Sequence, residues 1–168
     1  MKRDELLEQL VDILSREKEA YQVLSAVMTK EREAALQLAL DALNEAEFEK
    51  ENILSALGLL EEKRRHLVSR LADMLGCPEP AMNLTMISQR VGEPFAGRLQ
   101  QIASELSALF KSLQAANQRN KQLFEHSREL LAGSLQLFGE AMAPTPTYSA
   151  TGAYPNSAAS GKCICDEI

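Results

Sequence analysis

Apolar residues recur every three or four positions from the start of the chain. The first set comprises Leu7, Leu10, Leu14, Tyr21, Leu24 and Met28. This spacing matches the 3.6-residue turn of an α-helix and differs from the alternation of a strand. No Gly or Pro occurs before Gly58, and Asp4 can cap a helix whose first turn holds Glu5. The pattern therefore predicts a helix that begins near Asp4.

A second set of apolar positions alternates steps of four and three residues. It comprises Ile53, Leu57, Leu60, Arg64, Leu67, Leu71 and Met74. This is a coiled-coil-like seam with one charged interruption, at Arg64. A single helix over residues 4–75 would be about 105 Å long and would need a partner along its whole face. We therefore favour a turn near residues 39–44, with Asp41 as the cap of a second helix.

The stretch GCPEPAMN at residues 76–83 breaks the pattern, because Gly suits the end of a helix and proline cannot continue one. A short helix capped by Asn83 should follow. Its apolar residues lie on one side: Leu84, Ile87 and Val91. The longest helix should then run from Pro94, which suits a first turn, to about Met142.

This longest helix carries two apolar stripes. The first alternates steps of three and four throughout: Leu99, Ile102, Leu106, Leu109, Leu113, Ala116, Asn120, Leu123, Ser127, Leu130, Ser134 and Leu137. The second repeats every seven residues: Phe110, Asn117, Phe124, Leu131 and Phe138. The apolar face therefore widens from one stripe to two. Pro144 and Pro146 prevent the helix from continuing.

These elements predict an all-α fold, an elongated antiparallel bundle of three long helices plus one short connecting helix. The bundle should span residues 1–142. Residues 143–168 contain many Pro, Ser, Thr and Gly residues and too few apolar ones to fold alone, so we expect a flexible C-terminal tail. Tyr148 and Tyr154 are the aromatic residues of this tail.

Composition narrows the class of protein. Hydrophobic residues make up 45% of the chain and aromatic residues only 5%, with no Trp, which suits an aliphatic core between helices. The net charge of -6 disfavours nucleic acid as a partner. No apolar run approaches the roughly 20 residues that a membrane span requires. The start, MKRDELLEQL, does not have the pattern of a secretory signal. We therefore expect no nucleic-acid binding and no stable membrane insertion.

The sequence contains none of the common catalytic or cofactor-binding motifs considered. It contains no Gly-rich phosphate loop, no H-E-x-x-H and no G-x-S-x-G, so we expect no enzymatic activity and no cofactor. The odd number of widely spaced cysteines, with Cys77 far from the C-x-C pair of Cys163 and Cys165, favours a reducing compartment. That pair would need two more metal ligands. His66 and His126 lie far away in predicted helices, so we expect no metal site.

Two features of the last helix each have two interpretations. Asn117 and Asn120 interrupt an apolar stripe; a buried Asn can fix helix register, and alternatively the amides can bind a client. The broad apolar face can be the core of the bundle. Where the first two helices do not cover it, it would be a binding surface for another helix. This face comprises Leu123, Phe124, Leu130, Leu131, Leu135, Phe138 and Met142.

Three stretches of the chain, in this order, carry a family resemblance. The first is EKENILSALGLLEEKRRHLVSRLADMLG at residues 49–76, and the second is NQRNKQLFEHSRELLAGSLQLF at residues 117–138. A Pro/Thr linker and a Y-x-x-x-G pattern, Tyr148 to Gly152, follow them. Over residues 1–152 the chain resembles the FlgN-type flagellar export chaperones.

The resemblance implies a cytoplasmic, non-enzymatic chaperone built as a long helical bundle. Such a protein would bind the C-terminal helices of two hook–filament junction proteins, keep them unassembled and dock on the membrane-bound export gate. The implied client-binding residues are Asn117, Asn120, Leu123, Phe124, Leu130, Leu131, Leu135 and Phe138. The implied docking residues are Tyr148 and Gly152.

The chain departs from the family pattern at two places. The expected Gly-Asp turn between the first helices appears as Leu40-Asp41, and the tail continues past Gly152 with Tyr154 and the C-x-C end. Two other interpretations also remain. One is a structural coiled-coil or homodimeric helical adaptor whose wide face is buried between two copies. The other is a metal-binding or redox helical protein built on the C-x-C end.

Overall fold

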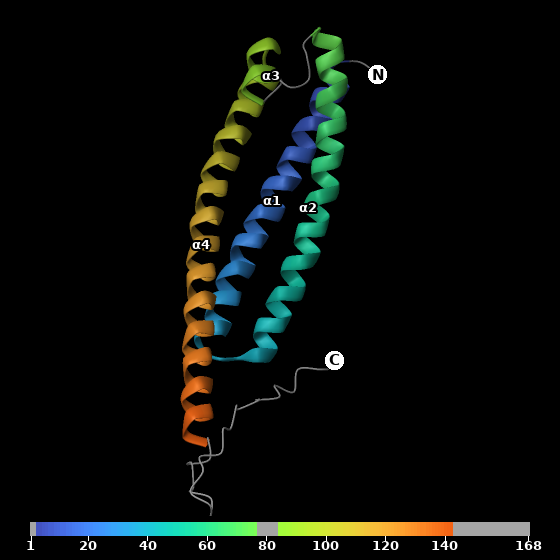
Figure 1. Ribbon diagram of the computed structural model, residues 1–168. Coiled ribbons are helices and arrows are strands. Elements are labelled where there is room, and N and C mark those ends of the chain that lie inside the picture. Colours follow the sequence, from blue (N-terminus) through green and yellow to red (C-terminus); the bar gives the residue numbers. More distant parts are fainter. Residues whose placement is uncertain (1–2, 77–83, 143–168) are drawn as a thin grey trace, which may run out of the picture. The chain divides into compact units, whose positions relative to one another are not determined.

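The computed structural model describes residues 3–76 and 84–142 of the 168-residue chain, with side chains up to Gly139. The regular elements in these residues are four helices: α1 (Arg3–Leu36), α2 (Leu40–Leu75), α3 (Leu84–Arg90) and α4 (Phe95–Met142) (Figure 1). The prediction of an all-α fold with three long helices and one short one is confirmed. The predicted tail, residues 143–168, lies outside the described residues. The described residues divide into two units, one up to Phe124 and the other from Glu125 onward.

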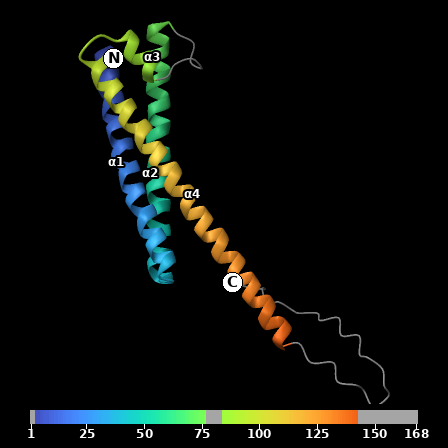
Figure 2. The same cartoon turned by 90° about the vertical axis from the view of Figure 1, so that its left-hand side faces the viewer.

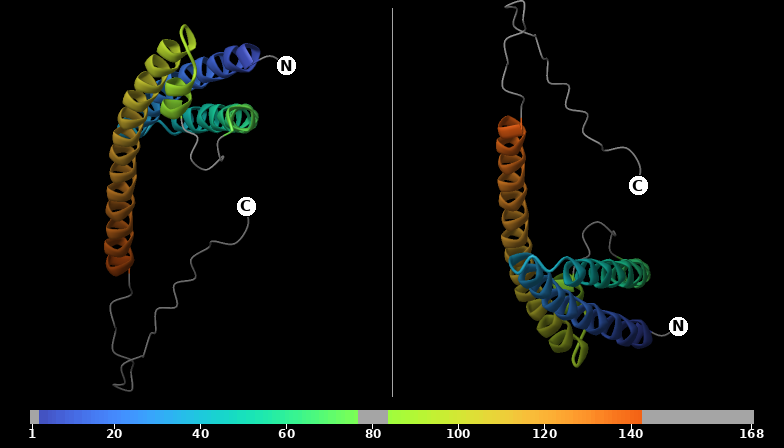
Figure 3. Two further views of the ribbon diagram at one scale, coloured as in Figure 1. Left: turned by 90° about the horizontal axis from the view of Figure 1, so that it is seen from above. Right: turned by 90° about the horizontal axis from the view of Figure 1, so that it is seen from below.

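In the first unit, α1 and α2 lie side by side and are joined by a short turn (Figures 1 and 3). The Leu38 N–H donates to the Ala35 carbonyl (3.2 Å), and the Ala39 N–H donates to the Ala34 carbonyl (3.0 Å). Leu38 has a φ of 55°, in the left-handed region that few residues with a branched side chain adopt. The turn therefore depends on one unusual backbone conformation.

The predicted position of this turn is a few residues too late, and the predicted cap is wrong. α2 begins at Leu40, and its N-cap, Ala39, makes no side-chain capping bond. Asp41 lies inside the first turn of α2, where its charge still favours the positive end of the helix dipole. No local signal marks the turn, because Leu38 adopts the conformation for which Gly is usually selected.

Ion pairs between helices give their directions. Successive pairs between α1 and α2 are Glu17–Arg64 (3.0 Å) and Glu31–Lys50. Successive pairs between α1 and α4 are Glu8–Arg98 (2.9 Å) and Lys18–Glu105 (2.9 Å). From the first to the second pair along α1, the partner's residue number falls from 64 to 50 on α2. On α4 it rises from 98 to 105. Within residues 1–124, α2 is therefore antiparallel to α1, and α4 is parallel to it.

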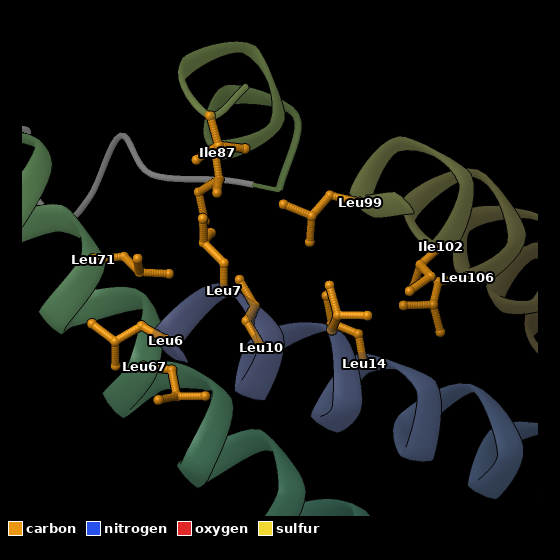
Figure 4. Packing of buried hydrophobic residues seen from close by; sticks show 12 residues of the cluster. Leu6, Leu7, Leu10, Leu14, Leu67, Leu71, Ile87, Leu99, Ile102 and Leu106 are labelled. Carbon is orange, nitrogen blue, oxygen red and sulfur yellow. The ribbon is translucent and has the colours of Figure 1, made fainter. Parts of the chain in front are cut away.

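The start of α1, the end of α2, α3 and the start of α4 lie near one another (Figure 2). The larger apolar cluster lies between them (Figure 4). Leu7, Leu10 and Leu14 are fully buried at its centre. The other helices contribute Leu67, Leu71, Ile87, Leu99, Ile102 and Leu106. A smaller cluster follows along the bundle: Leu24, Met28, Leu57 and Leu113. Each large side chain buried in this way stabilises the fold by about 1.5–3 kcal/mol.

The helix ends near the break behave largely as predicted. Gly76 ends α2 with a φ of 65°, and its N–H bonds to the carbonyls of Ala72 and Asp73. A side chain at this φ would cost about 1–2 kcal/mol. Ile87 and Val91 are buried on one side of the α3 region, as expected, whereas the proposed cap Asn83 lies outside the described residues. α4 begins at Phe95, directly after Pro94.

Candidate functional site

The first half of α4 forms one wall of the core. Four residues of its predicted stripe are buried: Leu99, Ile102, Leu106 and Leu113. Leu109 and Ala116 pack at the edge of the smaller cluster. Phe110, from the second stripe, is 47% exposed and meets the Tyr21 ring edge-on, with ring centroids 4.6 Å apart. The predicted stripe is confirmed over this half of the helix.

Asn120 is buried at the end of this covered half and is 4% exposed. Its amide nitrogen Nδ2 donates to the Met28 carbonyl oxygen (2.9 Å) and to Oε2 of Glu31 (3.1 Å). The other carboxylate oxygen of Glu31 accepts a hydrogen bond from Lys50. This polar cluster, Asn120, Glu31 and Lys50, connects α4, α1 and α2. It is the arrangement expected of a buried Asn that fixes the register of helices.

Asn117 behaves differently from Asn120, although the two were predicted as a pair. Its side chain is exposed on α4. One amide is therefore used inside the bundle, and the other faces solvent. Leu123 and Phe124, at the end of the first unit, are half-buried.

The second half of α4 carries an exposed apolar stripe. Exposed fractions there are 60% for Leu130, 66% for Leu131, 70% for Leu135, 68% for Leu137 and 67% for Phe138. We call these five residues the α4 stripe. In the second unit, the described residues 125–142 are the last part of α4. An apolar stripe of this kind usually marks a surface that another helix covers.

Glu17 of α1 is a second buried carboxyl group, in addition to Glu31. Glu17 is only 5% exposed, and its Oε1 accepts a hydrogen bond from Nε of Arg64 at 3.0 Å. Arg64 is the charged interruption that the sequence indicated in the α2 seam. Burial raises the pKa of the Glu17 carboxyl, and the Arg64 charge and hydrogen bond oppose that rise. Desolvation has the larger effect on the pKa, so ionising Glu17 costs more free energy in the folded protein than in the unfolded chain.

Two neighbouring groups also have shifted pKa values. Burial raises the pKa of the Tyr21 hydroxyl, and the nearby charge of Glu17 acts in the same direction. Hydrogen bonds from Lys18 and then Gln101 lower the pKa of the Glu105 carboxyl. Both shifts favour the charge state that each group already has at neutral pH.

The Glu17 shift predicts a pH dependence of stability. A carboxyl with a raised folded-state pKa stabilises the fold fully below its unfolded pKa of about 4.5, and this contribution is lost as pH rises through the folded pKa. Glu17→Gln keeps an acceptor for Arg64 and removes the titration. Urea unfolding at pH values of about 4 and 7.5 should therefore show the variant gaining stability relative to wild type as pH rises.

Glu62→Gln, at an exposed position of α2, is the control for loss of one negative charge. It should leave the difference from wild type unchanged between the two pH values. A Glu17→Gln protein that instead lost stability relative to wild type as pH rose would show that the Arg64 pairing outweighs desolvation.

Other candidate residues are exposed or lie outside the described part of the chain. His66 and His126 are exposed on α2 and α4. Tyr148, Gly152 and the three cysteines fall outside the described residues. Among residues 3–76 and 84–142, no group of three or more His, Cys, Asp or Glu side chains is placed to hold a metal ion. No helix in these ranges is long and apolar enough to cross a membrane.

Comparison with known protein families identifies a match over most of the chain. The family model described as FlgN protein matches residues 1–156 of this 168-residue chain. Neither the curated proteins nor the solved structures give a match. The matched region includes all four helices, the polar cluster and the α4 stripe. The chain therefore belongs to the FlgN family of flagellar export chaperones.

Proposed function

We propose that this chaperone binds hook–filament junction proteins in the cytoplasm, prevents their premature assembly and delivers them to the membrane-bound export gate. The observation that supports client binding is the α4 stripe, whose five large apolar side chains are at least 60% exposed. Covering the apolar C-terminal helix of a junction protein with this stripe would bury apolar surface on both partners. It would also keep that helix from pairing with other subunits.

The proposed client-binding residues are Asn117, Asn120, Leu123, Phe124, Leu130, Leu131, Leu135 and Phe138. Most of this set is exposed or half-buried and so is accessible in the free chain. Asn120 is the exception, because its amide is bonded to α1. It would contact a client only if these bonds opened, and otherwise it would act by holding α4 in place.

The proposed gate-docking residues are Tyr148 and Gly152. The family match extends to residue 156 and includes both residues, which supports the assignment. Tyr suits a transient contact, since its ring supplies apolar area and its hydroxyl a hydrogen bond. In this division, α4 binds the client and the segment after it docks on the export gate.

A pull-down tests this division. The immobilised C-terminal helix of a junction protein should retain wild type and the Tyr148→Ala variant equally, within about twofold. The cytosolic domain of the export gate should retain Tyr148→Ala at least about tenfold less well than wild type, a loss typical of an aromatic anchor. Tyr154→Ala is the matched control for loss of one aromatic ring and should behave as wild type in both assays.

Two outcomes would contradict the proposal. Loss of client binding in Tyr148→Ala would show that the two tasks share one surface. A wild-type chain that retains no junction helix and forms a concentration-independent dimer by light scattering would instead favour the homodimeric structural adaptor.

A further inference from the structure

Three leucines are exposed where α1 turns into α2, at one end of this pair of helices (Figure 1). The exposed fractions are 59% for Leu36, 85% for Leu38 and 72% for Leu40. Because they are spaced two residues apart along a tight turn, they form one apolar surface, which we call the hairpin tip. Phe48, 69% exposed, lies about 12 Å further along α2. The hairpin tip belongs to the first unit and includes none of the residues proposed for client binding.

Leu38 is an unusual residue for its position. Its φ of 55° lies in the left-handed region, which Gly adopts without steric cost and Leu adopts only with strain. Glycine at this position would remove both the strain and the most exposed side chain of the hairpin tip. A residue that is unfavourable for backbone conformation and for solubility at once indicates a role in binding.

The segment that contains the hairpin tip is acidic. Residues 30–50 include six acidic and three basic residues. Two of the basic residues, Lys30 and Lys50, are already paired with glutamates of the facing helix. The third, Arg32, is half-buried on α1. The basic residues of this segment therefore leave most of its exposed acids without a counter-charge.

Four exposed acids surround the hairpin tip: Glu33, Asp41, Glu45 and Glu47. Glu33 lies one turn before the end of α1, and the other three lie in the first two turns of α2. Within residues 3–76 and 84–142, no ion pair joins any of the four to a basic side chain. Their charges would repel an anionic membrane and the same tip of a second copy, and they would attract a cationic surface.

We propose that the hairpin tip docks a basic amphipathic helix of a partner protein. The apolar face of that helix would cover Leu38 and Leu40, and its Lys or Arg side chains would face Glu45 and Glu47. Covering the leucines buries apolar surface that the free chain leaves in water. The opposite charges speed association and select against acidic partners. The chaperone would thus have a second partner surface, whose use does not depend on the α4 stripe.

The test uses a fluorescein-labelled helical peptide of about three heptads, with Leu at the two core positions of each heptad and Lys or Ala elsewhere. A second peptide replaces every Lys by Glu, and a third keeps the composition of the first but scatters its Leu residues around the helix. All three are titrated by anisotropy into the full chain carrying Leu131→Gln and Phe138→Gln, so that the α4 stripe does not contribute. We expect the first peptide to bind at least about tenfold more tightly than the second and about fivefold more tightly than the third.

Apolar variants locate the binding. Leu38→Gly with Leu40→Gln should weaken the basic peptide at least about tenfold, and Leu38→Gly alone at least about threefold. Because Gly relieves the backbone at position 38, the melting temperature of Leu38→Gly should not fall below that of the parent chain. Leu54→Gln with Leu59→Gln, at two other exposed positions of α2, is the matched control and should change affinity less than about twofold.

Charge variants test the choice of a basic partner. Glu45→Gln with Glu47→Gln should weaken the basic peptide at least about threefold at about 50 mM salt, and less at about 500 mM. Glu19→Gln with Glu62→Gln removes the same charge at exposed positions away from the hairpin tip and should change little.

Three results would overturn the proposal: equal binding of the basic and acidic peptides, no effect of the tip variants, or an equal effect of either control pair. Two others would replace the occupant. Vesicles with about 30% phosphatidylglycerol that bind through Leu38 and Leu40, while the basic peptide does not, would favour a membrane surface. A dimer in light scattering that Leu38→Gly with Leu40→Gln abolishes would favour a second copy. Because the α4 stripe is disabled in this assay, its result is independent of junction-protein binding.

Discussion

Replacing Leu131 and Phe138 together by aspartate should weaken binding of a junction-protein helix at least a hundredfold. The two side chains are 66% and 67% exposed, so the free chain does not depend on them for packing. In the complex each would bury most of a large apolar group, worth about 1.5–3 kcal/mol. Aspartate loses this burial and adds the cost of placing a charge on an apolar surface. Titration calorimetry with the purified helix measures the change, since about 2.7 kcal/mol corresponds to a hundredfold.

The matched control is Leu54→Asp with Leu59→Asp. These leucines lie on α2, are 50% and 59% exposed, and receive the same two charges. They should leave client affinity within about twofold of wild type. Both double variants should melt within a few degrees of wild type, because surface changes rarely alter stability by more than about 0.5 kcal/mol. If the α2 pair weakened binding as much as the α4 pair, net charge rather than the α4 stripe would account for the loss.

The sequence predicted the helices and most of the core, but it could not divide α4 into a covered and an exposed half. The leucine spacing continues unchanged from Leu99 to Leu137, although Leu99 is buried and Leu137 is 68% exposed. Periodicity reports which side of a helix is apolar, and the extent of the neighbouring helices decides where that side is covered. The end of α1 was also not predictable to the residue, because the turn after it contains no Gly or Pro and is built on the left-handed Leu38.

The partners of the buried polar residues could not be predicted from the sequence either. Arg64 and Asn120 were visible as polar interruptions in leucine stripes, whereas their partners Glu17 and Glu31 were not. α1 carries acids at many positions, and most of them are exposed. Which of them turns inward depends on the register between helices, a tertiary property. Polar residues on an apolar stripe can thus be read from one sequence, but their partners require the structure.

Asn120→Ala should lower the free energy of unfolding by about 2–3 kcal/mol. This is a larger effect on stability than the one expected for Glu17→Gln. The amide donates two hydrogen bonds to α1, and its loss leaves the Met28 carbonyl and one Glu31 oxygen without that donor in a buried place. An unsatisfied buried polar group costs about 1–3 kcal/mol, with the higher values for charged groups such as the Glu31 carboxylate. Lys50 still pairs with Glu31, which limits the loss. Urea denaturation, with the midpoint and slope fitted separately, measures the change.

Asn117→Ala is the matched control, because the same substitution is made three residues earlier on the same helix at an exposed position. Its stability should stay within about 0.5 kcal/mol of wild type, since water can form hydrogen bonds in place of the exposed amide.

Comparing the two variants also separates the roles of the two amides. If Asn120 only holds α4 in register, a folded Asn120→Ala protein should bind a junction helix almost as well as wild type at low temperature, and Asn117→Ala should bind more weakly. An Asn120→Ala protein of unchanged stability that had lost client binding would contradict the structural role and make Asn120 a direct client contact.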